Sequence, residues 1–315
     1  YYAEHEERPW QPFLGTEHPS NNGIRGAYDR VWRRGYRYYN NMLHVENLWK
    51  FTRLYDYVAG DFMWTGIDYI GECRWPDKAA SCGPLDTCAF EKDAYYFYQS
   101  QWTDKPMLHL FPHWNLQGHE GEIIPVLCYT NCHEVELLVN GKSYGRKAYE
   151  FPLMGMSGIF GHFDNPRLRT TNDLHLSWDV EYVPGEIVAV GYVNGEAVCK
   201  EVLQTTGAPA KVALTLDKTE LTLQDVAHAE VRILDAEGRL VPDANVPLHF
   251  DVCGAGILLG ADNGCPYDHT PFLSPDRESF SGLALAIVQA KRLGDITVKV
   301  TSDGLEGAEA SILAK

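Results

Sequence analysis

A glutamate that directly follows a short apolar run is the first residue of this chain with the potential for chemistry. The stretch 11–17 reads QPFLGTE and places the carboxylate of Glu17 just after Phe13 and Leu14. A short apolar run of this kind is typical of a buried parallel strand whose last residue opens into a loop. In a β/α barrel, the carboxyl ends of the strands carry the catalytic groups. Glu17 is therefore a candidate nucleophile or general acid, and a solvated loop acid is the alternative interpretation.

A second stretch, residues 60–72 (GDFMWTGIDYIGE), repeats this arrangement. Its apolar run Phe62–Trp64 predicts another strand end. Two carboxylates, Asp68 and Glu72, follow this run and would also lie at the end of the barrel.

The segment between these two stretches predicts the element that positions them. Apolar residues recur at helical spacing over 45–59, and Gly60 stands where a helix C-cap glycine belongs. Strand, helix and strand in this order form a βαβ unit, whose two strands are parallel neighbours. The sequence therefore predicts that Glu17 and Trp64 lie side by side at one end of a barrel.

Several long motifs resemble glycoside hydrolase family 2, in its bacterial β-galactosidase branch. The resemblance covers essentially the whole chain, and the motifs that carry it are HEERPWQPFLGTEHPSNNGIRGAYDR, AGDFMWTGIDYIGE, KDAYYFYQSQW, HLFPHWN, YTNCHEVELLVNGKSYG, SWDVEYVPGEIVAVGY, DNGCPYD and SFSGLALAIVQA. It implies a retaining, exo-acting enzyme that hydrolyses terminal β-D-galactosides by double displacement.

The resemblance also implies roles for single residues. Glu17 matches the nucleophile that closes the seventh barrel strand, and Trp64 matches the tryptophan of the eighth strand that lines the sugar subsite. A flat aromatic ring suits the C–H face of a pyranose, and core packing is the alternative for Trp64. Asp68 is interpreted as an acceptor for a sugar hydroxyl and Glu72 as structural. The acid/base partner in this family ends the fourth strand, which this chain does not contain, so the chain alone is expected to be inactive.

Two further residues, His113 and Trp114, open the region after the barrel helix. They are candidate substrate contacts in the aglycone subsite. The alternative is that they pack at a domain interface.

The pattern of elements predicts a mixed fold in three parts. Residues 1–105 hold strands 7 and 8 of a (β/α)8 TIM barrel, ending in a helix over 91–102, and they are too few to close a barrel. Alternating strands over 106–206 predict a β-sandwich, with Asn-Gly hairpin turns at 140–141 and 194–195. Residues 207–315 predict a second, immunoglobulin-like sandwich. The loop 73–88 is expected at the active-site rim, and the loop 151–171 is expected to pack between domains, with a rim contact as the alternative.

The net charge and the distribution of apolar residues exclude some classes of binding partner. Asp and Glu number 43 against 27 Lys and Arg, which gives a formal net charge of -16. Such a surface repels polyphosphate, so no nucleic acid is expected. No apolar run approaches the ~18 residues of a membrane span, so no membrane contact is expected. The expected partners are a β-galactoside substrate and the N-terminal part of the same enzyme. A homo-oligomer is compatible with the sequence.

The eight cysteines form no C-x-x-C pair, so neither a metal nor another cofactor is expected. Free thiols favour a reducing, cytoplasmic compartment, and a periplasmic or secreted location stays open because the count is even. Asp262-Asn263-Gly264 predicts a tight turn, with a calcium site as the alternative.

Two other functions compete with a β-galactosidase. One is a β-glucuronidase or another β-glycosidase of the same family. The glucuronidase branch carries an Asn-x-Lys pair after the eighth strand to hold the sugar carboxylate, and the stretch GPLDTCAFEKD lacks it. The other is a non-catalytic carbohydrate-binding or spacer module made of the two sandwiches, for which Trp178 and Tyr182 would be the nearest aromatic pair.

Overall fold

The computed structural model describes residues 2–17, 23–28, 45–53, 55–149 and 174–315. The chain divides into two compact units. The N-terminal unit contains residues 1–68, 81–85 and 91–204, and the C-terminal unit contains residues 69–80, 86–90 and 205–315. The predicted packing loop 151–171 lies outside the described residues.

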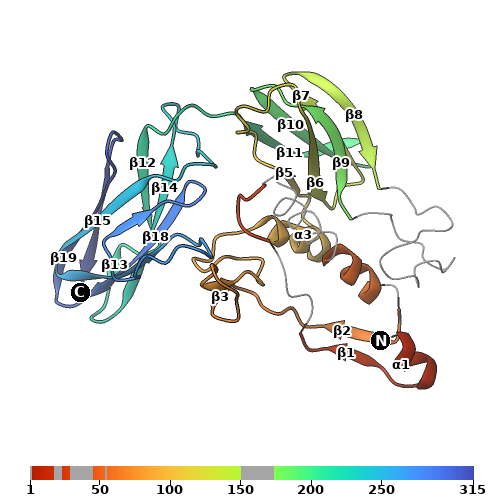
Figure 1. Cartoon of the computed structure of the whole chain (residues 1–315), viewed down its shortest axis with the longest axis horizontal. Helices are drawn as coiled ribbons and strands as arrows, with labels where there is room; N and C mark the ends of the chain where they lie inside the picture. Colours follow the sequence, from red (N-terminus) through yellow and green to blue (C-terminus); the bar gives the residue numbers. More distant parts are fainter. Residues whose placement is uncertain (1, 18–22, 29–44, 54, 150–173) are drawn as a thin grey trace. The chain divides into compact units, whose positions relative to one another are not determined.

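The N-terminal unit begins with helix α1 (Tyr2–Glu7) and a parallel pair of short strands, β1 (Phe13–Gly15) and β2 (Val58–Asp61) (Figure 1). Residues 45–53 between them are helical, so the predicted strand–helix–strand unit is present. The second strand ends one residue before the apolar run Phe62–Trp64 that was expected to form it. Gly60, expected to cap the helix, lies inside β2 instead. Within the described residues this parallel sheet has two strands, so the assignment to a TIM barrel stays a prediction.

Helix α3 (Asp93–Trp102) leads from this region into a β-sandwich, and it matches the helix predicted over 91–102. One sheet has the strand order β11-β10-β7-β8 and the other the order β5-β6-β9. The strands are β5 (Leu108–Phe111), β6 (Ile123–Thr130), β7 (Glu134–Val139), β8 (Lys142–Ala148), β9 (Leu176–Glu181), β10 (Glu186–Val193) and β11 (Glu196–Gln204).

The core of this sandwich is formed by strands in which fully buried residues alternate with less buried ones. Every second residue of β7 is buried, as expected for a strand with one face in the interior. Trp114, Trp178 and Tyr182 are all within this core. The hairpins β7–β8 and β10–β11 turn at Asn140 and Asn194, whose φ angles of 48° and 53° confirm the predicted Asn-Gly turns.

The C-terminal unit is a second two-sheet sandwich, with strand orders β12-β14-β18-β16 and β13-β20-β19-β15-β17. Its interior is mostly aliphatic and includes Phe250, and alternate residues of β14 and β18 enter it. The strands are β12 (Lys211–Leu216), β13 (Glu220–Leu221), β14 (Val226–Leu234), β15 (Pro247–Gly254), β16 (Gly256–Asp262), β17 (Asp276–Glu278), β18 (Leu283–Ala290), β19 (Gly294–Thr301) and β20 (Ala308–Ala314).

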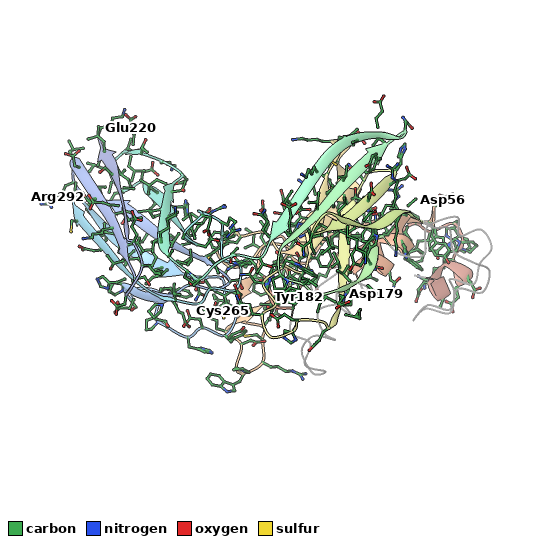
Figure 2. All side chains as sticks on the ribbon, turned by 90° about the horizontal axis from the view of Figure 1, so that it is seen from above. Asp56, Asp179, Tyr182, Glu220, Cys265 and Arg292 are labelled. Carbon is green, nitrogen blue, oxygen red and sulfur yellow. The ribbon has the colours of Figure 1, made fainter. Side chains whose placement is uncertain are left out.

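A small antiparallel hairpin of β3 (Tyr69–Ile70) and β4 (Ala79–Ala80) belongs to the C-terminal unit, although it lies early in the sequence. The hairpin is fastened to the sandwich near Cys265, which is labelled in Figure 2: the backbone N–H of Lys78 donates to the carbonyl of Pro266 at 2.6 Å. All eight cysteines are free. Within the described ranges, no helix combines the length and the apolar character that a membrane crossing requires.

Candidate active site

The carboxyl ends of β1 and β2 form the edge where the predicted site residues gather. Gly15 pairs with Asp61, and the N–H of Phe62 donates to the carbonyl of Gly15 at 2.8 Å. Both strands therefore end at the same level. Because parallel strands point in the same direction, the residues that follow each strand leave from the same edge.

Glu17 follows β1 by two residues and is exposed among the described residues. The residues directly after it, 18–22, lie outside the described part of the chain. The position matches the prediction that this carboxylate stands at the carboxyl end of a parallel strand. Its catalytic role remains a prediction.

Trp64 follows β2 at the same edge. Its side chain is 40% exposed, and the peptide bond to Thr65 is cis. Phe62, two residues earlier, is 61% exposed. Both rings therefore offer an apolar surface at the edge that carries Glu17, as a stacking role for Trp64 requires.

Asp68, which was predicted to accept a hydrogen bond from a sugar hydroxyl, is buried. Its carboxylate is 2.6 Å from Nζ of Lys92, and it accepts a hydrogen bond of 2.8 Å from the N–H of Gly83. Gly83 must lack a side chain here, because a Cβ atom would lie 2.6 Å from the carbonyl carbon of Ile67. Asp68 thus holds the segment after β2 against the start of α3. A contact with a sugar hydroxyl remains a prediction.

Trp114 is 1% exposed and belongs to the core of the first sandwich. Its indole N–H donates to the carbonyl of Val183 at 3.0 Å, and its ring meets that of Tyr182 edge-on at 4.9 Å. These contacts place the Trp114 side chain in the core, and its predicted contact with substrate stays a prediction. Its neighbour His113 is half-buried beside Tyr28, with ring centroids 5.1 Å apart, and its contact with an aglycone stays a prediction.

The N-terminal unit also contains a polar cluster of Tyr28, Asp93, His109 and Glu201 that the sequence did not predict. Asp93 at the start of α3 accepts hydrogen bonds from Tyr28 Oη at 2.9 Å and from His109 Nε2 at 2.6 Å. The other ring nitrogen of His109 is 3.8 Å from Glu201 on β11. Burial raises the pKa of Glu201 above its usual range, against the opposing effects of His109 and of the Leu110 N–H. The cluster joins helix α3 to strands β5 and β11, which indicates a structural role.

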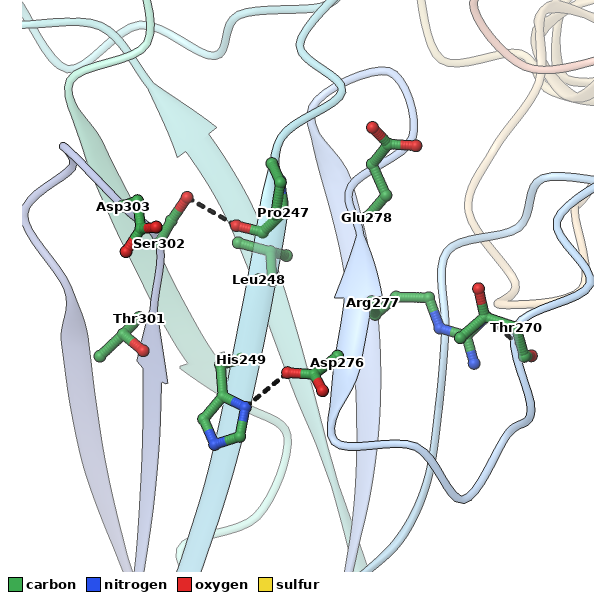
Figure 3. A pocket seen from close by; sticks show the side chains of 10 residues that line it. All are labelled: Pro247, Leu248, His249, Thr270, Asp276, Arg277, Glu278, Thr301, Ser302 and Asp303. Atoms are coloured by element: carbon green, nitrogen blue, oxygen red, sulfur yellow. Dashed lines mark hydrogen bonds and ion pairs between the residues drawn. The ribbon is translucent and has the colours of Figure 1, made fainter.

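A groove of about 440 Å³ lies on the C-terminal sandwich, between β15, β17 and β19 (Figure 3). His249 is bound to Asp276 at 2.6 Å, and the guanidinium of Arg277 contacts Asp268 at 2.7 Å. No Phe, Tyr or Trp ring appears among its lining residues, all of which are described. The groove therefore lacks a stacking surface for a sugar.

The predicted turn at Asp262-Asn263-Gly264 is present, with Gly264 at a φ of 77°. Asp262 is bound to Lys78 and Thr87, both at 2.9 Å. In the part of the chain that the structure describes, no group of three or more candidate ligands is placed to hold a metal ion.

Comparison with known proteins relates this architecture to carbohydrate-active enzymes. Residues 212–311 match the model of a glycoside hydrolase family 2 C-terminal domain 5, and residues 121–199 match a domain of unknown function, DUF4982. The chain is 37% identical to β-galactosidase BoGH2A of Bacteroides ovatus, over 98% of this chain and 37% of that protein. It is 32% identical to a putative β-glucuronidase of Formosa agariphila, over 81% of this chain and 24% of that protein.

A solved structure shows the same relationship. The crystal structure of a β-glycosidase from Bacteroides vulgatus aligns with 99% of this chain and 43% of its own, with a TM-score of 0.84 and 30% identity. The chain thus spans less than half the length of the relatives that it matches.

Proposed function

Because this chain belongs to glycoside hydrolase family 2, we propose that it is the C-terminal part of a retaining, exo-acting β-galactosidase in which Glu17 is the nucleophile. Residues 1–105 are then the last quarter of the catalytic barrel, and 106–206 and 207–315 are its two following sandwich domains. The observation that carries the proposal is the parallel pairing of β1 and β2, which sends Glu17 and Trp64 out from one edge.

In the proposed double-displacement mechanism, Glu17 and Trp64 have different roles. The Glu17 carboxylate attacks the anomeric carbon and forms a covalent glycosyl-enzyme, which water then hydrolyses with overall retention. Trp64 presents an apolar ring face to the pyranose. The general acid that protonates the leaving oxygen comes from a part of the barrel outside this chain.

The substrate is a neutral galactoside rather than a glucuronide. A glucuronide needs a cation for its carboxylate, and Lys78 and Lys92 are the two lysines between β2 and α3. Lys92 is paired with buried Asp68, and Lys78 is paired with Asp262 at 2.9 Å. Neither ammonium is available for a sugar carboxylate, which supports the galactoside. The similarity to a putative β-glucuronidase keeps glucuronide hydrolysis as the second candidate.

A purely carbohydrate-binding role is less well supported. Trp178 and Tyr182, the aromatic pair that such a role would use on the first sandwich, are 3% and 0% exposed. Both rings therefore pack inside the sandwich, where no ligand reaches them.

Two experiments on the full-length protein test the proposal. Reaction with a 2-deoxy-2-fluoro-β-galactoside should trap the glycosyl-enzyme, and peptide mapping should find the label on Glu17. A label on another residue would refute the assignment. The second experiment compares kcat/KM for aryl β-galactoside and aryl β-glucuronide, and faster turnover of the glucuronide would select the second candidate.

A further inference from the structure

Two cysteines of the N-terminal unit, Cys132 and Cys199, bring their sulfur atoms into contact. The two Sγ atoms are 3.4 Å apart, although the residues are separated by 67 positions in the sequence. Cys132 lies in the turn between β6 and β7, and Cys199 lies on β11. Both residues belong to the same compact unit, and both are free thiols.

The contact depends on a glycine beside the two thiols. Gly191 of β10 is the cross-strand partner of Cys199, and a Cβ atom at this position would lie 2.7 Å from both sulfur atoms. Nonbonded atoms do not approach so closely without strong repulsion, so a side chain here would push the sulfurs away. Gly191 does not have a positive φ angle. Glycine is therefore needed at this position for space rather than for its backbone conformation.

Hydrogen bonds hold both members of the pair in place. The N–H of Cys132 donates to Oγ1 of Thr130 at 2.9 Å. The N–H of the next residue, His133, donates to the carbonyl of Tyr192 on β10 at 2.9 Å. Cys199 is held by the antiparallel pairing of β11 with β10. The fold itself therefore brings the two sulfurs together, so no further loop has to be closed before they react.

The alternative is that the two cysteines only fill space, since buried cysteines often behave as small apolar residues. Cys128 of β6 is such a residue, because it is fully buried within the core of the first sandwich. Cys132 and Cys199 are not members of that core cluster. Cys132 is buried, but Cys199 is only half-buried, so a reagent in solution can reach the pair from the Cys199 side. A space-filling role requires neither this access nor the contact between the two sulfurs.

We infer that Cys132 and Cys199 are a disulfide-forming pair that stabilises the first sandwich under oxidising conditions. The sulfurs have to approach from 3.4 Å to about 2.05 Å, over which the bond forms. The inference goes beyond the proposed glycosidase function and does not depend on it, because neither thiol has a part in that mechanism.

The oxidation can be written with a small disulfide, oxidised glutathione, as the oxidant. The thiolate of Cys199, the more accessible member, attacks one glutathione sulfur and releases the other as a thiolate. The thiolate of Cys132 then attacks Sγ of Cys199 in this mixed disulfide and releases the second glutathione. In total the two cysteines lose two electrons and two protons, which convert one oxidised glutathione into two molecules of reduced glutathione.

The cross-link should stabilise the sandwich because it constrains the unfolded chain. It closes a loop that contains β7 to β10. A disulfide across a loop of this length removes much of the conformational freedom of the unfolded chain, whereas the folded chain already holds the two residues together. The oxidised protein should therefore unfold at a higher temperature than the reduced protein.

Peptide mapping of the full-length protein tests whether the bond forms. The reduced protein is incubated with oxidised glutathione at about pH 8.5, which favours thiolates, until no further change occurs, and is then alkylated and digested. Long incubation is needed because burial and the hydrogen bond with Cys132 raise the pKa of Cys199 to about 12. A peptide linked through Cys132 and Cys199 should be the main disulfide product. Recovery of both residues as alkylated thiols, or of Cys199 only as a mixed disulfide with glutathione, would overturn the inference.

Thermal unfolding of the same protein tests whether the bond stabilises the sandwich. Oxidation should raise the Tm of its transition by roughly 5–15 °C. This rise should vanish in Cys132→Ser and in Cys199→Ser, and because each variant is compared with its own reduced form, the cost of the substitution cancels. Cys253→Ser, at an exposed thiol of the C-terminal unit, is the control and should keep the full rise. Equal Tm values for oxidised and reduced wild type, or a rise that survives in Cys199→Ser, would contradict the inference.

Discussion

Lys92 and Asp68 form a buried ion pair of 2.6 Å in which both side chains are at most 3% exposed. The ammonium also donates to the carbonyl of Gly23 at 2.9 Å, and the carboxylate accepts from the N–H of Gly83. The pair therefore ties together the parts of the chain around Gly23, Asp68, Gly83 and Lys92. Removing one partner leaves the other charge buried without its counter-charge, which costs much more than the pair itself contributes.

We expect Asp68→Ala to lower the free energy of unfolding of this unit by roughly 3–5 kcal/mol. The double variant Asp68→Leu/Lys92→Met should cost less than either single change, because no charge is then left buried. Urea unfolding followed by near-UV circular dichroism measures both. Glu134→Ala, which breaks the ion pair of the same unit with Arg146, whose side chains are 40% and 38% exposed, is the control and should have a much smaller effect. A single variant no less stable than this control would contradict the prediction.

Glu17→Ala in the full-length protein should lower kcat on an aryl β-galactoside by about 10³-fold or more, since the first bond-forming step is lost. Added azide should restore turnover and yield the α-galactosyl azide, because the small anion enters from the face that the carboxylate occupied. The anomeric configuration of the product, read by NMR, separates a nucleophile from a general acid.

Glu72→Gln is the control for this experiment, because Glu72 is an exposed carboxylate after β2 that accepts a hydrogen bond from the hydroxyl of Tyr69. It should keep most of the activity. Near-normal turnover of Glu17→Ala, or a β-configured azide product, would exclude Glu17 as the nucleophile.

Local sequence signals predicted the elements that depend on neighbouring residues. Asn140 and Asn194 have the positive φ angles that Asn-Gly hairpin turns require, and the parallel pair β1–β2 follows from a helical segment between two apolar runs. The position of β2 was missed because backbone pairing with β1 defines the strand, whereas hydrophobicity marks Phe62 and Trp64, which lie beyond its end.

The sequence did not predict features that depend on contacts between residues far apart in the chain. Trp114 is in a core because it meets Tyr182, far away in the sequence, and nothing in the motif HLFPHWN encodes that partner. The cluster of Tyr28, Asp93 and Glu201 around His109 brings together residues from four distant segments. Such a cluster leaves no periodic pattern, so only the folded chain shows it.

Asp235 makes the C-terminal unit sensitive to acid. Burial alone would raise the pKa of Asp235, but the N–H groups of Arg239 and Gly207 and the Arg239 guanidinium outweigh it and hold the pKa well below its usual range. The carboxylate accepts these bonds at 2.8 Å from both Arg239 N and Arg239 Nε and at 3.0 Å from Gly207 N. Because the pKa of Asp235 in the folded chain is lower than the usual value of 3.8, its ionised carboxylate stabilises the fold at pH values above 3.8. This contribution is lost as the pH falls below 3.8 toward the folded-state pKa.

Asp235→Asn should therefore lower the Tm of the C-terminal transition at pH 7, and the difference from wild type should shrink as the pH falls below about 3.8. Differential scanning calorimetry across this range measures it. Asp303→Asn, at an exposed turn of the same unit, controls for the loss of one surface charge. A difference that stays constant with pH would mean that Asp235 acts through packing rather than through its charge.

Glu201 should produce the opposite dependence on pH in the N-terminal unit. Burial raises the pKa of its carboxyl group, and Asp93 adds to this, while His109 and the N–H of Leu110 oppose it. When the folded-state pKa exceeds the usual value of 4.5, the folded chain binds more protons than the unfolded chain, so stability falls as the pH rises from 4.5 through the folded-state pKa.

Glu201→Gln keeps an acceptor for Leu110 N, which lies 2.7 Å from Glu201 Oε2, but carries no charge. The stability of this variant relative to wild type should therefore increase as the pH rises above about 4.5. Urea unfolding at several pH values measures this difference, with Glu181→Gln on the exposed face of β9 as the control for one lost charge. A relative stability that decreases over the same range would show that the Glu201 carboxylate is stabilised by His109 more than it is penalised by burial.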